Sequence, residues 1–186
     1  SYDVEFIPGN PNRVYGISDV NGQFSICLSQ NGGDDFTPDP AFPENIPNVA
    51  GGLIAVTAGP NDLVFAVLLS ENNTPFIYKK EGDPGIWERL AIGNSSQLPM
   101  NNGQGFFDLV LEVDPEYPEE IFVGTVTLYK SSDGGASFQP IGGYAGDFPI
   151  HPDIQWMELL GDGKVWVATD GGMTYSTDNF TNVGLA

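Results

Sequence analysis

The strongest constraint on the fold of this 186-residue chain is an internal repeat. Four related segments recur, and each follows a short run in which apolar and polar residues alternate, as in a β-strand. Their first positions are 51, 51 and 45 residues apart. The segments are 29–36 (SQNGGDDF), 80–87 (KEGDPGIW), 131–138 (SSDGGASF) and 176–180 (STDNF). A repeat of this length predicts a chain assembled from four similar units.

Each unit reads as a meander of four short antiparallel strands with turn residues between them. One meander has two faces to bury, so neighbouring meanders must stack, and radial stacking gives a propeller. A β-sandwich is the alternative, but it does not require the same hairpin at a fixed interval. We therefore expect an all-β fold, a β-propeller of four-stranded antiparallel blades. The four blades cover approximately residues 1–48, 49–104, 105–148 and 149–186.

The pattern Ser-x-Asp-x-Gly-x-x-Phe at 131–138 resembles the Asp-box, or BNR repeat, of sialidase-like propellers, sortilin-type receptors and xyloglucanase-type glycoside hydrolases. The resemblance covers essentially the whole chain. It implies a hairpin on the outer rim, where serine and aspartate oxygens bond turn N–H groups, glycine takes a positive φ and the aromatic packs into the blade. The box positions are Ser29, Asn31, Gly33, Phe36, Gly85, Trp87, Ser131, Asp133, Gly135, Phe138, Ser176 and Asp178.

The catalytic groups of these families are incomplete in this chain. A sialidase needs three arginines around its substrate carboxylate, and only Arg13 and Arg89 are present. A xyloglucanase takes its two acids from two propellers, so four blades supply at most one. We expect a non-catalytic binding or interaction module with a glycan or protein ligand. The alternatives are a fragment of a glycoside hydrolase, which leaves enzymatic activity open, and a sortilin-type receptor piece, which would bind peptides.

Propellers bind ligands at the mouth of the central channel, where each innermost strand begins. The residues expected there are Asp3, Asp108, His151 and Asp153, with turn-capping or structural hydrogen bonds as the alternative roles. Trp156 and Trp166 fall inside strands and are expected in the core, as is Trp87. No cofactor is expected, although the Asp-Gly turns at 162–163 and 170–171 leave calcium as an alternative to plain hairpin turns.

The charge balance limits the partners. The chain has 25 acidic and 6 basic residues, a net charge of −19, which disfavours nucleic acid and anionic membranes as partners. Cys27 is the single cysteine, so no disulfide framework is expected, and no apolar run is long enough for membrane insertion.

The chain opens on Ser1 and shows no closing strand exchange, which predicts a processed piece of a larger propeller. Missing sequence or another chain would complete the ring. We expect a secreted or cell-surface location, in a bacterium.

Overall fold

The computed structural model describes residues 3–20, 23–42, 49–57, 62–100, 104–180 and 183–185. Within these ranges the chain forms sixteen strands and no helix, and the strands make four separate four-stranded sheets. Neighbouring strands in every sheet are antiparallel and consecutive in the chain. The expected all-β propeller with four-stranded antiparallel blades is therefore confirmed.

We call the four sheets blades 1 to 4. Blade 1 contains β1 (Val4–Phe6), β2 (Val14–Val20), β3 (Gln23–Ser29) and β4 (Thr37–Pro38). Blade 2 contains β5 (Val49–Thr57), β6 (Leu63–Ser70), β7 (Pro75–Glu81) and β8 (Trp87–Ile92). Blade 3 contains β9 (Val110–Val113), β10 (Ile121–Gly124), β11 (Thr127–Ser131) and β12 (Gln139–Gly143). Blade 4 contains β13 (Ile154–Leu159), β14 (Val165–Thr169), β15 (Gly172–Ser176) and β16 (Val183–Leu185).

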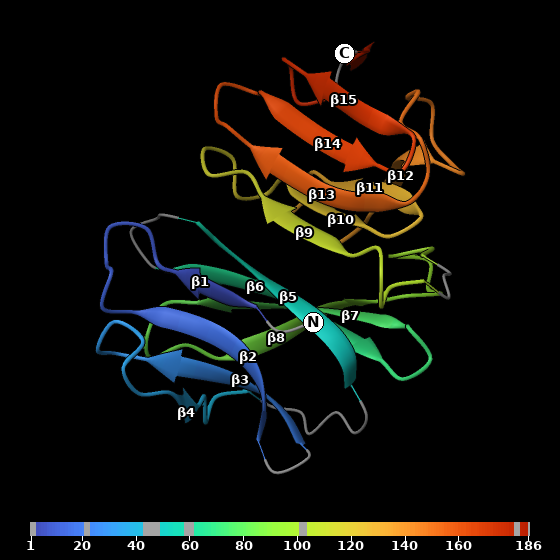
Figure 1. Ribbon diagram of the computed structural model, residues 1–186. Coiled ribbons are helices and arrows are strands. Elements are labelled where there is room, and N and C mark those ends of the chain that lie inside the picture. The colour runs from blue at the N-terminus through green and yellow to red at the C-terminus, as the bar shows by residue number, and fades with distance from the viewer. Residues whose placement is uncertain are drawn as a thin grey trace.

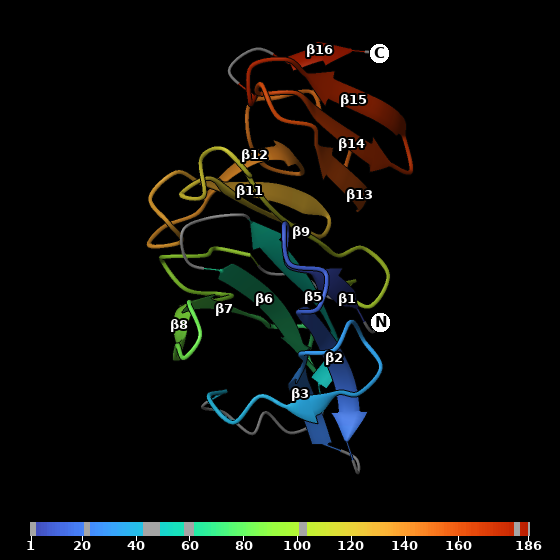
Figure 2. The ribbon, with the colours of Figure 1, turned by 90° about the vertical axis from the view of Figure 1, so that its left-hand side faces the viewer.

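The blades follow one another in chain order. In two views at right angles, blade 1 lies at one end of the molecule and blade 4 at the other (Figures 1 and 2). The innermost strands are adjacent along this row, β1 beside β5, β5 beside β9 and β9 beside β13. Each sheet therefore has a following face, turned toward the next blade, and a preceding face, turned toward the one before.

The core consists of three layers, one between each pair of blades. The following face of blade 1 packs on the preceding face of blade 2, and this layer includes Tyr15, Ile26, Ile54 and Tyr78. Equivalent layers join blades 2 and 3 and blades 3 and 4. Because both faces of the middle sheets are covered, their central strands are almost continuously apolar, as in Leu63–Ser70.

Basic side chains link neighbouring blades near the rim. Lys80 on β7 reaches Asp39 of blade 1, with Nζ 2.7 Å from Oδ2. Arg13 of blade 1 pairs with Asp62 and Asp83 of blade 2, at 2.6 and 3.2 Å. Among the described residues, Arg13, Lys80 and Lys130 contact acceptors on an adjacent blade, so at least half of the six basic residues of this acidic chain serve blade junctions.

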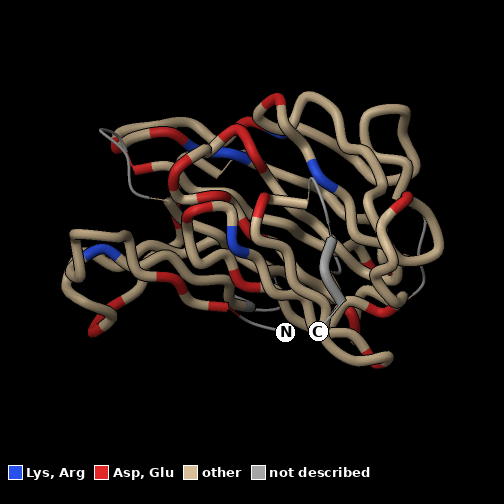
Figure 3. Tube along the Cα trace, turned by 90° about the horizontal axis from the view of Figure 1, so that it is seen from above, with Lys and Arg blue, Asp and Glu red and all other residues tan. Residues whose placement is uncertain are grey.

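Acidic residues are spread along the Cα trace and outnumber the basic ones (Figure 3). The side chain of Cys27 is buried. The described residues include no helix long and apolar enough to cross a membrane.

Candidate binding site on the channel face

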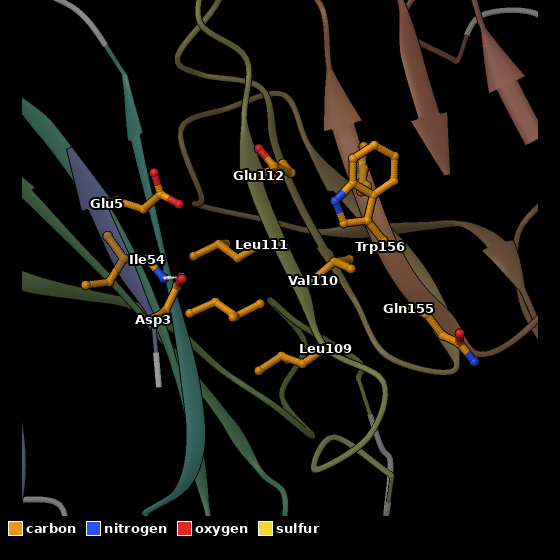
Figure 4. Close-up of a pocket in the computed structure, with 11 residues that line it drawn as sticks. Asp3, Glu5, Ile54, Leu109, Val110, Leu111, Glu112, Gln155 and Trp156 are labelled. Atoms are coloured by element: carbon orange, nitrogen blue, oxygen red, sulfur yellow. Dashed lines mark hydrogen bonds between the residues drawn. The ribbon is translucent and has the colours of Figure 1, made fainter. Parts of the chain in front are cut away.

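All four innermost strands contribute to one pocket of about 270 Å³. The pocket lies on the inner edge of the row of blades, where the propeller channel is expected. Its acidic side chains are Asp3 and Glu5 before and on β1, and Glu112 on β9, and its floor is apolar (Figure 4). The lining is completed by Leu53, Ile54, Leu109, Val110, Leu111, Gln155, Trp156 and Met157.

The acidic groups of this site belong to a repeat that the sequence analysis missed. In three blades a glutamate of the innermost strand pairs across the sheet with an aromatic residue of the second strand. The pairs are Glu5 with Tyr15, Glu112 with Phe122 and Glu158 with Trp166, and blade 2 has Ala55 with Phe65 instead. In blades 1, 2 and 3 the two residues are ten positions apart in the chain, a spacing that could have revealed the repeat.

The environment of Glu112 favours its protonated form. Burial, together with the neighbouring charges of Glu158, Glu5 and Asp3, raises the pKa of this carboxyl to about 8. Burial also raises the pKa of Glu5, again with help from Asp3 and Glu158. Glu112 can thus bind a proton at neutral pH and release it when a positive group enters the pocket.

Trp156 stands beside these acids and is 47% exposed. Its indole projects at the opening of the pocket (Figure 4). The expectation that it is a core residue is wrong, because Trp156 pairs with Ala168 on the face of blade 4 that no other blade covers, whereas the equivalent Val110 of blade 3 is buried. Trp166 is partly buried against Tyr175, whereas Trp87 is buried as expected.

Asp3 lines this pocket, but both of its carboxylate oxygens already accept hydrogen bonds from backbone N–H groups. Its Oδ2 accepts a hydrogen bond from the N–H of Ile54 on blade 2 at 2.8 Å, and its Oδ1 accepts one from the N–H of Val4 at 3.0 Å. The carboxylate thus joins the innermost strands of two blades.

The other three expected mouth residues come together between blades 3 and 4, apart from the pocket lining. His151 Nδ1 lies 2.7 Å from Asp170 Oδ1, and Asp153 Oδ1 accepts a hydrogen bond from Gln104 Nε2 at 3.1 Å. Asp108 is buried, and its Oδ1 has no hydrogen-bond partner. Burial raises the pKa of Asp108, and Asp153 and Asp170 contribute to the same shift.

The rim hairpins of blades 1, 3 and 4 share a serine-centred pair of hydrogen bonds. In blade 3, Ser131 Oγ donates to Asp133 Oδ1 at 2.8 Å and accepts from the N–H of Gly135 at 2.9 Å. Ser29 makes the same pair of bonds with Asn31 and Gly33. In blade 4, Ser176 Oγ donates to Asp178 and accepts from the N–H of Phe180 instead.

The glycine positions of these hairpins differ from blade to blade in backbone conformation, and the aromatic positions differ in burial. Gly33 and Gly135 have φ values of +96° and +93°, which explains the glycine there. Gly85 instead lies too close to the carbonyl of Glu81 to admit a side chain. Phe138 and Trp87 are buried, whereas Phe36 is 41% exposed, because it lies on the face of blade 1 that no other blade covers.

Among the described residues, no three histidine, cysteine, aspartate or glutamate side chains are placed to hold a metal ion together.

No protein-family model matches the chain, and no curated protein sequence matches it either. Several solved structures are similar to the chain. The chain is similar to the GH74 xyloglucanase from Xanthomonas campestris, with 18% identity and a TM-score of 0.55 over 98% of this chain and 24% of that one. It is also similar to YCF48 from Cyanidioschyzon merolae, with 13% identity and a TM-score of 0.52 over 99% of this chain and 70% of that one. The chain thus spans about a quarter of the xyloglucanase, and these similarities show the fold alone: it is a β-propeller fold.

Proposed function

We propose that this chain belongs to a non-catalytic binding module that holds a glycan or protein ligand at the channel pocket. The observation that carries the proposal is the convergence of all four innermost strands on one pocket that has acidic groups on its wall and an exposed tryptophan at its opening. Concave sites with an aromatic surface and a few converging polar groups are the usual ligand sites of proteins.

Each part of the pocket suits a definite ligand chemistry. The exposed indole of Trp156 offers an apolar face on which a sugar ring or an aliphatic side chain can pack. Glu5 and Glu112 offer hydrogen-bond acceptors for hydroxyl groups or for the ammonium and guanidinium groups of a protein. The net charge of −19 attracts positively charged segments and repels nucleic acid and anionic membranes.

The rim hairpins support membership of the Asp-box, or BNR-repeat, group of propellers. Ser29 and Ser131 make the same two hydrogen bonds at equivalent positions of different blades, which is the chemistry that the box requires. On this resemblance we propose a secreted or cell-surface location, in a bacterium. Further blades, from the same polypeptide or another chain, complete the ring.

Binding can be tested with the chain itself. The purified protein is applied to a glycan array and titrated calorimetrically with the best glycans and with a lysine-rich peptide. Trp156→Ala is expected to weaken binding by about tenfold or more, as for a central aromatic contact. Tyr144→Ala, which removes an aromatic side chain that is 77% exposed outside the pocket, should bind like the parent chain. Equal loss in both variants, or no binding to either ligand class, would contradict the proposal.

A glycoside hydrolase fragment is the second candidate function, and Glu112 favours it. A carboxyl with a pKa of about 8 stays protonated at neutral pH, as a general acid must. Hydrolysis of xyloglucan or aryl glycosides that is lost in Glu112→Gln and kept in Glu88→Gln, an exposed residue of β8, would support this function. Asp153→Ala tests the mouth residues in the same assay.

A further inference from the structure

The two ends of the row of blades expose sheet faces that are buried everywhere else in the molecule. The cross-strand register identifies equivalent positions in the four blades. Val4 of β1 occupies the same position, relative to the second strand of its blade, as Ile54, Leu111 and Met157 occupy in blades 2, 3 and 4. Those three residues are 3%, 4% and 1% exposed, but Val4 is 52% exposed. Phe6, equivalent to the buried Val113, is also 52% exposed.

Val4 lines an apolar hollow on the preceding face of blade 1. It has a volume of about 360 Å³ and contains no charged side chain. Its lining residues are Val4, Gly16, Ile17, Ser18, Cys27, Phe36 and Pro38. In blades 2, 3 and 4 the same face is covered by the blade before it.

The opposite end of the molecule has the complementary feature on the following face of blade 4. Tyr15, Phe65 and Phe122 are each fully buried by the next blade, but their equivalent, Trp166, is only partly buried. Met173 lies across the sheet from Ala168 on this face and is 51% exposed. The following face of blade 4 also carries Glu158, at the position that Glu5 and Glu112 occupy in blades 1 and 3. A preceding face and a following face of this kind are the two halves of a blade junction.

We propose that a second copy of this chain supplies the missing halves, so that blade 1 of each copy packs on blade 4 of the other. One chain carries both halves of the junction, and the three internal junctions show that these faces pack together. Two copies joined at both ends form a closed ring, which leaves no apolar face exposed. The acidic groups of the channel pocket lie outside both end faces, whereas Trp156, which pairs with Ala168, lies on the following face of blade 4 and so belongs both to the pocket and to that end face.

The test is the molar mass of the purified chain, measured by light scattering after gel filtration across a range of concentrations. We expect the mass of two chains. Phe6→Glu and Met173→Glu each place a charge in both junctions and should raise the dissociation constant by at least about tenfold. Both residues are half exposed in the single chain, so the variants should fold. Ile86→Glu is the matched control, because Ile86 is 79% exposed on a rim hairpin outside both faces.

Mixing the two variants tests the head-to-tail arrangement. Phe6→Glu keeps an intact blade 4 face, and Met173→Glu keeps an intact blade 1 face, so the mixture should form a dimer through one junction although neither variant does so alone. A monomeric parent chain would overturn the proposal. A dimer that survives either substitution, or is lost in Ile86→Glu, would overturn it as well, because the contact would then lie elsewhere.

Discussion

The Nζ atom of Lys80 lies 2.7 Å from Oδ2 of Asp39, and these side chains are 2% and 3% exposed. This ion pair joins blade 2 to blade 1, and Trp87 Nε1 donates to the same carboxylate oxygen at 3.0 Å. Lys80 occupies the position that serine holds in the other three rim hairpins. The hairpin of blade 2 has therefore replaced an internal hydrogen bond by a bond between blades.

Replacing Lys80 with methionine should destabilise the protein by about 3–5 kcal/mol, because it leaves a buried carboxylate without its cation. Urea denaturation measures the change. Lys79→Met on the same strand, whose side chain is 29% exposed, should alter the free energy of unfolding by less than about 0.5 kcal/mol. The double variant Lys80→Met/Asp39→Asn should recover part of the loss; a double variant no more stable than Lys80→Met would contradict the ion-pair explanation.

Protonation of Asp39 at low pH should destabilise this junction between blades 1 and 2. Burial alone would raise its pKa, but hydrogen bonds from Lys80, Trp87 and the N–H of Ala41 outweigh burial and lower the pKa below 3.8. The stabilisation is therefore complete above the unfolded-state pKa and is lost as the pH falls through the lower folded-state value.

The rim hairpin of blade 3 should lose stability when the hydroxyl oxygen of Ser131 is removed. Ser131→Ala removes the acceptor of the buried N–H of Gly135, and we expect a loss of about 1–3 kcal/mol. Ser132→Ala, at the exposed neighbour, is the control and should have little effect. Thermal denaturation of both variants measures the difference, and equal stabilities would show that this bond contributes nothing.

The repeated hairpins made the fold predictable, because the hydrogen bonds of each turn join residues that are close together in the sequence, such as Ser131, Asp133 and Gly135. The site was less predictable. The spacing of Glu112 from Phe122 repeats that of Glu5 from Tyr15, but glutamates are common and their convergence depends on how whole blades stack. Trp156 is exposed because no blade covers its face of blade 4, and its residue type alone does not specify that position.

Ionisation of Glu112 should make the folded protein less stable as the pH rises. Its pKa is about 8 in the folded chain and near 4.5 when unfolded, so the folded state binds more protons between these values. Stability should therefore fall as the pH rises from about 4.5 to about 8, by at most about 4 kcal/mol. Glu112→Gln removes this dependence and should be more stable than the parent chain at pH 8. Chemical denaturation at several pH values tests this, with Glu88→Gln, which is exposed, expected to behave like the parent.

Asp3 provides a test that separates a structural from a ligand-binding role at the pocket. Asp3→Ala removes the acceptor for the N–H of Ile54, a buried residue of blade 2, and we expect a loss of about 1–3 kcal/mol. Asp3→Asn keeps one acceptor oxygen and should lose less. Asp34→Ala, at an exposed turn residue, should be close to neutral. If Asp3→Ala instead leaves the free energy of unfolding unchanged but weakens ligand binding, the carboxylate serves the ligand and not the junction between blades 1 and 2.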